Sequence, residues 1–162
     1  MVSRVFSAGL SGIDGYIVTV ECFLSGGLPR LDVVGLPTGA VSEAGERVRA
    51  AAKACAFDWP VSRLTVNLAP ADTKKAGTAY DLPLLLSILA AAGEIDAPPD
   101  NALFFGELSL TGELRPVCGA LSMALAARDA GFKTVFVPAM NAAEASYASG
   151  VTVFPIRTLN EL

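Results

Sequence analysis

The stretch NLAPADTKKAGTAYDLP, residues 67–83, joins two structural elements of different kinds. Before the loop, residues 63–68 alternate polar and apolar side chains, which predicts a β-strand. After the loop, residues 82–92 form an almost continuous apolar run, which predicts a buried helix. Asp81 is suited to cap the start of this helix and Gly93 its end. The stretch therefore predicts a strand, a polar loop and a helix, an arrangement on which active sites are often built.

Upstream of this stretch the sequence predicts a hairpin and a helix. Residues 16–24 and 31–34 are rich in β-branched and aromatic side chains and flank a Gly-Gly-Leu-Pro turn, so they are expected to pair. Apolar residues then recur every three or four positions over 41–55, which predicts an amphipathic helix. Glu43 and Arg47, four residues apart, are expected to pair on its surface.

Downstream of the stretch, strands and helices continue to alternate. Asn141 and Glu144 are expected to cap a short helix together. Residues 157–162 look like the start of a further element. The expected elements are a strand over 103–110 with a turn and a return over 113–115, a helix over 117–130 closed by Gly131, a strand over 134–137, a short helix over 141–148 and a strand over 151–154.

This order of elements predicts a mixed-sheet α/β or α+β fold in a single domain over residues 1–162. Hydrophobic residues make up 52% of the chain and charged residues 17%, which is ample for a core. The net charge of −4 does not by itself indicate a nucleic-acid surface, because phosphate binding needs clustered Lys and Arg. The N-terminus lacks the apolar core of a signal peptide, and the apolar run over 82–92 is too short to cross a bilayer. A cytoplasmic protein without membrane contact is therefore expected.

The absence of histidine excludes several classes of site. It removes the usual general base, the Ser–His and Cys–His arrangements and every zinc site that contains histidine. Cys22, Cys55 and Cys118 form no CxxC pair and are expected to be buried thiols of a reducing compartment. No GxxxxGK[ST] motif is present, so the chain alone is not expected to bind a nucleotide cofactor. Because it has no histidine and no carboxylate cluster, it is not expected to bind a metal either.

Lys74, Lys75 and Thr78 raise the question of whether the loop is catalytic. A lysine whose pKa is lowered by burial can act as the base for a serine or threonine nucleophile. However, a base usually approaches its nucleophile from another element, and lysines on loops tend to be solvated. The residues alone therefore leave a Thr/Lys dyad open, whereas Glu107 and Glu113 are interpreted as a solvated rim rather than a catalytic pair.

Longer motifs in the chain resemble a known family. They are NLAPADTKKAGTAYDLPLLLSILAAAG, GELSLTGELRPVCGALSMALAARDAG and VFVPAMNAAEA. Together with the opening SRVFSAGLSGIDGYIVTVECFLSGGLPRLDVVGLP, they resemble the ComM/YifB family of magnesium-chelatase-like AAA+ proteins. The resemblance implies an N-terminal domain with the two-layer fold of the Lon proteolytic domain, a mixed sheet with packed helices of the ribosomal-protein-domain-like superfamily. It also implies an AAA+ ATPase domain after residue 162, which this chain lacks.

The same resemblance identifies the two positions that carry the catalytic dyad in Lon peptidases. The serine position falls on Ala79 and the lysine position on Leu121. Neither side chain can act as a nucleophile or a base, and Thr78 stands one position too early. The resemblance therefore implies a domain that has lost its catalytic residues, and the alternative is an active Ser/Lys- or Thr/Lys-type peptidase.

The resemblance also implies a role for the whole protein. It would be a hexameric ATPase that uses ATP and Mg²⁺, bound outside this chain, to drive branch migration of DNA in recombination and natural transformation. This chain would be a non-catalytic assembly or docking domain, with its own AAA+ domain and further copies as partners. Lys74 and Lys75, with Thr78 beside them, are the residues expected to contact DNA phosphates or a partner protein.

Overall fold

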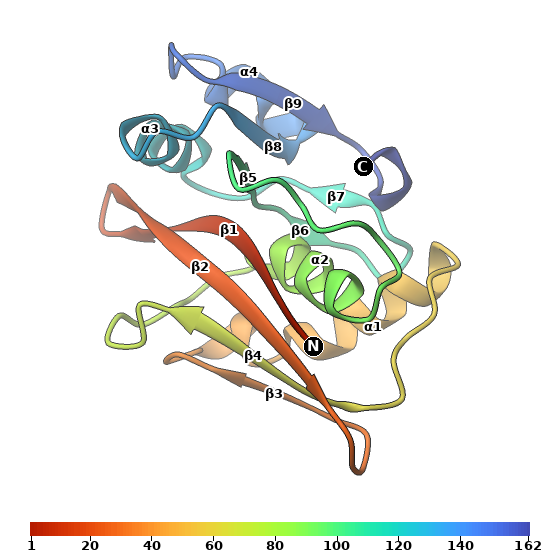
Figure 1. Cartoon of the computed structure of the whole chain (residues 1–162). Helices are drawn as coiled ribbons and strands as arrows, with labels where there is room; N and C mark the ends of the chain where they lie inside the picture. Colours follow the sequence, from red (N-terminus) through yellow and green to blue (C-terminus); the bar gives the residue numbers. More distant parts are fainter.

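A seven-stranded mixed sheet organises the chain, with strand order β3-β4-β2-β1-β5-β8-β9 and a separate β6-β7 ribbon (Figure 1). The computed structural model describes residues 1–162. The strands are β1 Val2–Ser11, β2 Asp14–Ser25, β3 Arg30–Val34, β4 Arg63–Ala69, β5 Ala102–Phe104, β6 Glu107–Leu108, β7 Leu114–Arg115, β8 Thr134–Pro138 and β9 Thr152–Ile156. The helices are α1 Ala44–Ala54, α2 Asp81–Ala91, α3 Ala120–Asp129 and α4 Ala142–Ala145, with the 3-10 turns η1 Gly39–Val41, η2 Ala139–Asn141 and η3 Leu159–Glu161.

The predicted mixed sheet with packed helices is confirmed. β1, β2 and β4 are antiparallel neighbours, whereas β3 runs parallel to β4 and the four strands β1, β5, β8 and β9 run parallel to one another. The predicted return after residue 110 is the β6-β7 ribbon, which is antiparallel. Strand, loop and helix follow one another around residues 63–91 as the sequence predicts.

The predicted pairing of 16–24 with 31–34 is wrong. β2 forms its hairpin with β1, in a register that runs from Val2 opposite Phe23 to Ser11 opposite Asp14. On its other side β2 pairs with β4, and β4 separates it from β3. The ten-residue strand β1 offers a much longer ladder than the five-residue strand β3, and only two residues connect it to β2. Three serines and one glycine in β1 conceal this strand in the sequence.

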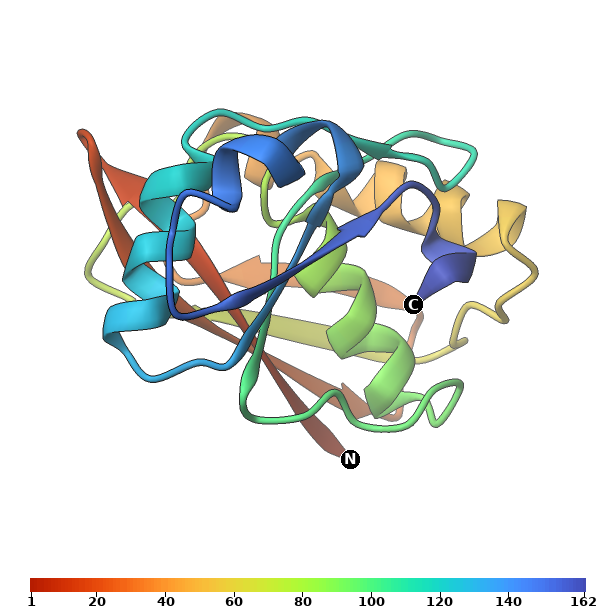
Figure 2. The ribbon, with the colours of Figure 1, turned by 90° about the horizontal axis from the view of Figure 1, so that it is seen from above.

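Two hydrophobic cores lie on opposite faces of the sheet, because successive residues of a strand point to opposite sides. Figure 2 shows α2 and α3 on either side of the strands that run between them. We call these the α1–α2 core and the α3–α4 core. The first includes Val5, Val18, Val20, Leu64, Val66 and Leu85. The second includes Ala8, Leu103, Phe105, Met123, Val135 and Ala145.

The helix ends agree only in part with the sequence prediction. Gly93 follows the end of α2 as predicted, and the N–H of the next residue, Glu94, donates to the carbonyl of Leu89 at 2.9 Å. The predicted cap of the short helix is wrong. The amide of Asn141 instead forms two hydrogen bonds with the backbone of Val117, at 2.8 and 3.0 Å. Residues 157–162 contain the short 3-10 turn η3, whose Leu159 packs into the α1–α2 core.

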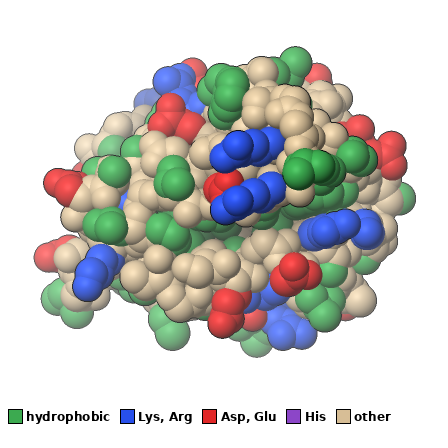
Figure 3. Space-filling view, turned by 90° about the horizontal axis from the view of Figure 1, so that it is seen from below, with side chains coloured by type: hydrophobic (Ala, Val, Ile, Leu, Met, Phe, Trp, Pro, Cys, Tyr) green, Lys and Arg blue, Asp and Glu red, His purple; other side chains and the backbone are tan.

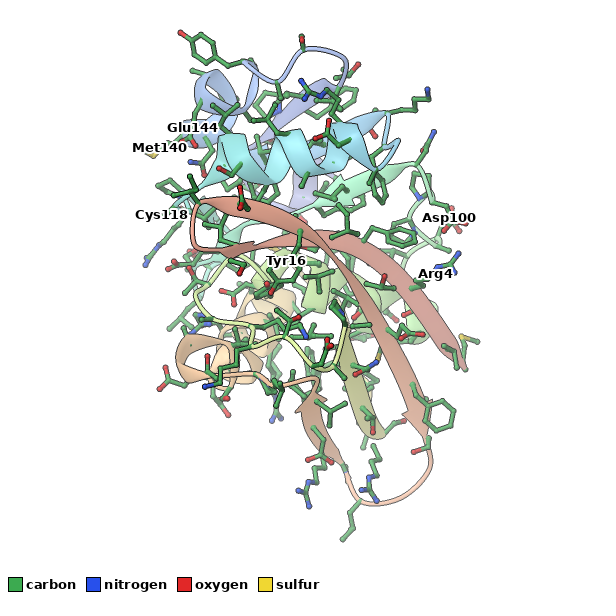
Figure 4. The ribbon with its side chains drawn as sticks, turned by 90° about the vertical axis from the view of Figure 1, so that its left-hand side faces the viewer. Arg4, Tyr16, Asp100, Cys118, Met140 and Glu144 are labelled. Carbon is green, nitrogen blue, oxygen red and sulfur yellow. The ribbon has the colours of Figure 1, made fainter.

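The cysteines differ from one another in exposure. Cys22 is buried, Cys55 is half-buried and Cys118 is exposed, so the prediction of three buried thiols is wrong for Cys118. Figure 4 shows Cys118 near Met140 and Glu144, at the end of the molecule where the β1-β2 hairpin turns. None of the helices is both long enough and apolar enough to span a lipid bilayer.

Candidate functional site

The loop between β4 and α2 is fastened to neighbouring elements by its backbone. The N–H of Lys75 donates to the carbonyl of Leu36 at 3.0 Å, and the carbonyl of Lys75 accepts from the N–H of Thr38 at 2.9 Å. Close to α2, the carbonyl of Ala79 accepts from the N–H of Gly106 at 2.9 Å. These bonds connect the loop to the turn after β3 and to the segment between β5 and β6. The loop is therefore an ordered part of the fold and not a free flap.

Lys75 does not lie on the surface, although it was expected to be solvated. Its side chain is 0% exposed, and its Nζ donates to the carbonyl of Pro70 within the same loop. Burial lowers the pKa of Lys75, while the negative charge of Asp72 acts in the opposite direction. In this conformation the amine cannot reach a phosphate of a bound nucleic acid.

The two other candidate residues of the loop, Lys74 and Thr78, have separate partners. Lys74 is exposed, and its carbonyl accepts a hydrogen bond from the hydroxyl of Tyr16, labelled in Figure 4, at 3.3 Å. The hydroxyl of Thr78 donates to a carboxylate oxygen of Glu107 at 2.6 Å. No hydrogen bond connects Thr78 with the amine of Lys74 or Lys75. The geometry therefore does not assemble the Thr/Lys dyad that the sequence leaves open.

Ala79 and Leu121, the two positions equated with the peptidase dyad, both pack against the α3–α4 core. Ala79 lies just before α2, and Leu121 is the second residue of α3, where its N–H donates to the carboxylate of Glu144 at 2.8 Å. The fold thus brings two segments far apart in the sequence to the same core. A methyl group and an isobutyl group fill space there and offer no lone pair for proton transfer.

A buried ion pair fixes the start of α2, and the sequence prediction missed it. The guanidinium of Arg47, on α1, donates from Nε to Oδ2 of Asp81 at 2.8 Å and from Nη2 to Oδ1 at 2.9 Å. The Oδ2 atom also accepts from the N–H of Leu108 at 3.1 Å. Asp81 is therefore not an N-cap, and Arg47 pairs with it rather than with Glu43.

The pair lies close to the apolar core. The side chain of Asp81 is 1% exposed and that of Arg47 is 20% exposed. Burial raises the pKa of Asp81, and the hydrogen bonds from Arg47 and Leu108 offset this only in part. The bond to Asp81 raises the pKa of Arg47 further above its usual value. The pair connects α1, α2 and β6 at the point where the loop enters α2.

Comparison with known proteins places the chain in a family. A family model for subunit ChlI of Mg-chelatase matches residues 20–141, which is most of the chain. The chain belongs to this Mg-chelatase-like family. The competence protein ComM of Haemophilus influenzae is 41% identical to it over 156 residues, which is 96% of this chain and 30% of ComM. The protein YifB of Escherichia coli is 42% identical over 135 residues, which is 83% of this chain and 27% of YifB.

These matches confirm the resemblance to the ComM/YifB family. The chain spans less than a third of the length of these relatives. A mitochondrial Lon protease homolog of Caenorhabditis briggsae is 36% identical over 80 residues, about half of this chain and 8% of that protein. This partial match is compatible with the expected likeness to the Lon proteolytic domain.

Proposed function

We propose that this chain is a non-catalytic assembly or docking domain of a longer ComM/YifB-type protein. The observation that carries the proposal is the combination of a well-fastened loop with two aliphatic side chains, Ala79 and Leu121, at the positions equated with a peptidase dyad. The hydroxyl of Thr78 and the amine of Lys75, the remaining candidates for chemistry, are each engaged with another partner. A rigid surface without a nucleophile suits binding better than catalysis.

The longer protein, in this proposal, is a cytoplasmic AAA+ ATPase that forms a hexamer and moves DNA branches during recombination and natural transformation. ATP and Mg²⁺ would bind in the part that lies outside this chain. Two observations support this proposal: the family model describes a subunit of Mg-chelatase, and a relative with 41% identity is named a competence protein.

Of the two lysines in the loop, only Lys74 is placed to contact DNA, since Lys75 is covered. Figure 3, which looks at the underside of Figure 1, shows basic and acidic side chains interspersed on that face. A surface of mixed charge gives little of the counterion release that drives nucleic-acid binding. Lys74 would therefore add one phosphate contact to a binding site formed mainly by the rest of the protein, without reading sequence.

Deleting residues 1–162 from the longer protein tests the assembly role. We expect the fraction of oligomeric rings, measured by sedimentation velocity with ATP and Mg²⁺, to fall clearly at a fixed protein concentration. The remaining domains should keep their own thermal unfolding transition, which shows that they are still folded. An unchanged ring fraction would contradict an assembly role for this chain.

A peptidase assay is the companion measurement on the chain itself. Neither the wild type nor the Thr78→Ala variant should cleave an unstructured protein substrate, while an active Lon peptidase serves as the positive control. Cleavage by the wild type that disappears in Thr78→Ala would support the peptidase alternative instead.

Lys74→Glu in the longer protein tests the DNA contact. Because one phosphate contact is removed, the slope of log K against log salt should become shallower by about one, with an equal effect on all DNA sequences. The matched control is Lys133→Glu, an exposed lysine between α3 and β8, which should leave the slope unchanged. Equal slopes for wild type and Lys74→Glu would remove Lys74 from the DNA site.

A further inference from the structure

The sheet has two regions that no helix covers, and they differ in chemistry. One lies on the outer side of β3, β4 and β2, opposite α1 and α2, and it is mostly polar. Its residues include Glu21, Phe23, Asp32, Thr65 and Asn67. The other lies beyond α2, on the side of β5, β8 and β9 that faces away from α3 and α4. The polar region needs no cover in water. The second region is aromatic, and an exposed apolar patch of this kind marks a contact site.

Three phenylalanines form this second region, which we call the aromatic face. Phe104, Phe136 and Phe154 occupy matching positions on the parallel strands β5, β8 and β9. Their rings stack in sequence, with centroids 4.7 and 5.0 Å apart. Exposure increases along the row, and Phe154 on the edge strand is 42% exposed. The aromatic face is therefore an apolar surface that ends at an open sheet edge.

A groove of about 390 Å³ adjoins the aromatic face and is lined mainly by apolar side chains. Its lining comes from α2, the connection after α2, the sheet and the C-terminal turn, and it includes Leu86, Leu89, Ile95, Ala97, Pro98, Pro99, Phe104, Phe136, Leu159 and Leu162. Leu162, the last residue of the chain, is therefore part of the groove wall. Figures 1 and 2 show the C-terminus on the same side of the sheet as α2. Whatever polypeptide follows Leu162 begins at this groove.

We propose that the segment directly after residue 162 in the longer protein lies across the aromatic face and fills this groove with apolar side chains. This inference rests on the proposed function, in which the chain is one part of a longer ComM/YifB-type protein. ComM and YifB are more than three times as long as the part that matches this chain, so most of their polypeptide lies outside that part. A tethered segment has an effective concentration in the millimolar range, so even a weak apolar contact stays closed.

The size of the groove favours a segment over a second copy of the chain. A stable dimer needs about 800 Å² of buried surface on each partner, together with compensation for lost rotational and translational freedom. A groove of about 390 Å³ accepts only a few side chains. The segment also needs little length, because three strands are crossed in about 10 Å and an extended chain covers about 3.3 Å per residue.

Thiol labelling of Phe154→Cys tests the proposal in three proteins: the chain 1–162, the same chain extended by about 20 residues, and the longer protein. Labelling at position 154, identified by peptide mass mapping, should slow by about tenfold or more on extension, since a covered thiol reacts only when the contact opens. The matched control is Phe23→Cys, which lies on the polar region and replaces a side chain that is 49% exposed. Its labelling rate should be the same in all three proteins.

Equal rates at position 154 in the chain 1–162 and in the extended chain would overturn the proposal. Slowing in the chain 1–162 that increases with protein concentration would assign the aromatic face to a second copy, and would overturn it as well. Equal slowing at positions 23 and 154 would show general shielding and no specific contact. The labelling needs neither ATP, DNA nor a ring, so its outcome is independent of the tests of the proposed function.

Discussion

Arg47→Ala should lower the free energy of unfolding by about 3–5 kcal/mol, because it leaves a buried carboxylate without its partner. Asp81 is 1% exposed and accepts two hydrogen bonds from Arg47, so water cannot replace the guanidinium without opening the contact between α1 and α2. Urea unfolding of the 162-residue chain at neutral pH measures the loss. The midpoint should fall while the slope with denaturant stays the same.

Arg4→Ala is the control for the loss of an arginine from an ion pair. Arg4 and Asp100 approach to 3.2 Å near one edge of the molecule (Figure 4), but their side chains are 53% and 73% exposed. An exposed pair contributes about 0–1 kcal/mol, so this variant should unfold almost as the wild type does. Similar losses in Arg4→Ala and Arg47→Ala would show that burial of the Arg47–Asp81 pair has no special effect.

The double variant Arg47→Met with Asp81→Leu separates the cost of breaking the pair from its net contribution. Burial raises the pKa of Asp81 in the folded protein, so the folded state holds this proton more tightly than the unfolded chain. The wild-type protein therefore loses stability as the pH rises from about 4 through the raised pKa of Asp81. At neutral pH it still bears the cost of burying this ionised carboxylate. The double variant should recover most of the loss and retain about 1–3 kcal/mol for the unpaired N–H of Leu108.

The predictable part of this fold is local. Helix α1 and strand β4 follow from the period of their apolar residues, because that period is set by the backbone geometry of each element, whereas α2 and β8 follow from continuous apolar runs of helical and strand length. The pairing of strands is a tertiary property. β1 is a strand because β2 and β5 lie beside it, and its three serines and one glycine carry no propensity that would indicate this.

The candidate site also divides into a part that the sequence predicts and a part that depends on tertiary packing. The loop and its two aliphatic positions, Ala79 and Leu121, follow from motifs in the sequence, whereas the environment of each polar side chain does not. Arg47 faces both a carboxylate four residues before it and one on another helix, and only packing places it against Asp81. Lys75 is adjacent to Lys74, yet one is covered by its own loop and the other is exposed.

Gly35→Ala should destabilise the protein by about 2–5 kcal/mol and loosen the loop after β4. Gly35 has φ of +101°, which costs an alanine about 1–2 kcal/mol. A Cβ atom there would also overlap the backbone carbonyl of Leu68, which is fixed within β4, and relieving such overlap costs about 1–3 kcal/mol. Because the next residue, Leu36, accepts from the N–H of Lys75, a displaced turn also releases the loop. Hydrogen exchange should therefore accelerate at the amides of Lys75 and Thr38.

Gly39→Ala, four residues further along the same connection, separates strain from overlap. Gly39 has φ of +50°, but a Cβ atom there would meet nothing within 4 Å. It should therefore cost only the backbone strain, about 1–2 kcal/mol, and leave exchange at Lys75 unchanged. Equal effects of the two substitutions would mean that the contact between Gly35 and Leu68 does not hold the loop. A larger effect at Gly35, with faster exchange only at the amides of Lys75 and Thr38, is the expected result. It would show that the close approach of the backbones at Gly35 and Leu68 keeps Lys75 covered, so that Lys74 is the exposed lysine of the loop.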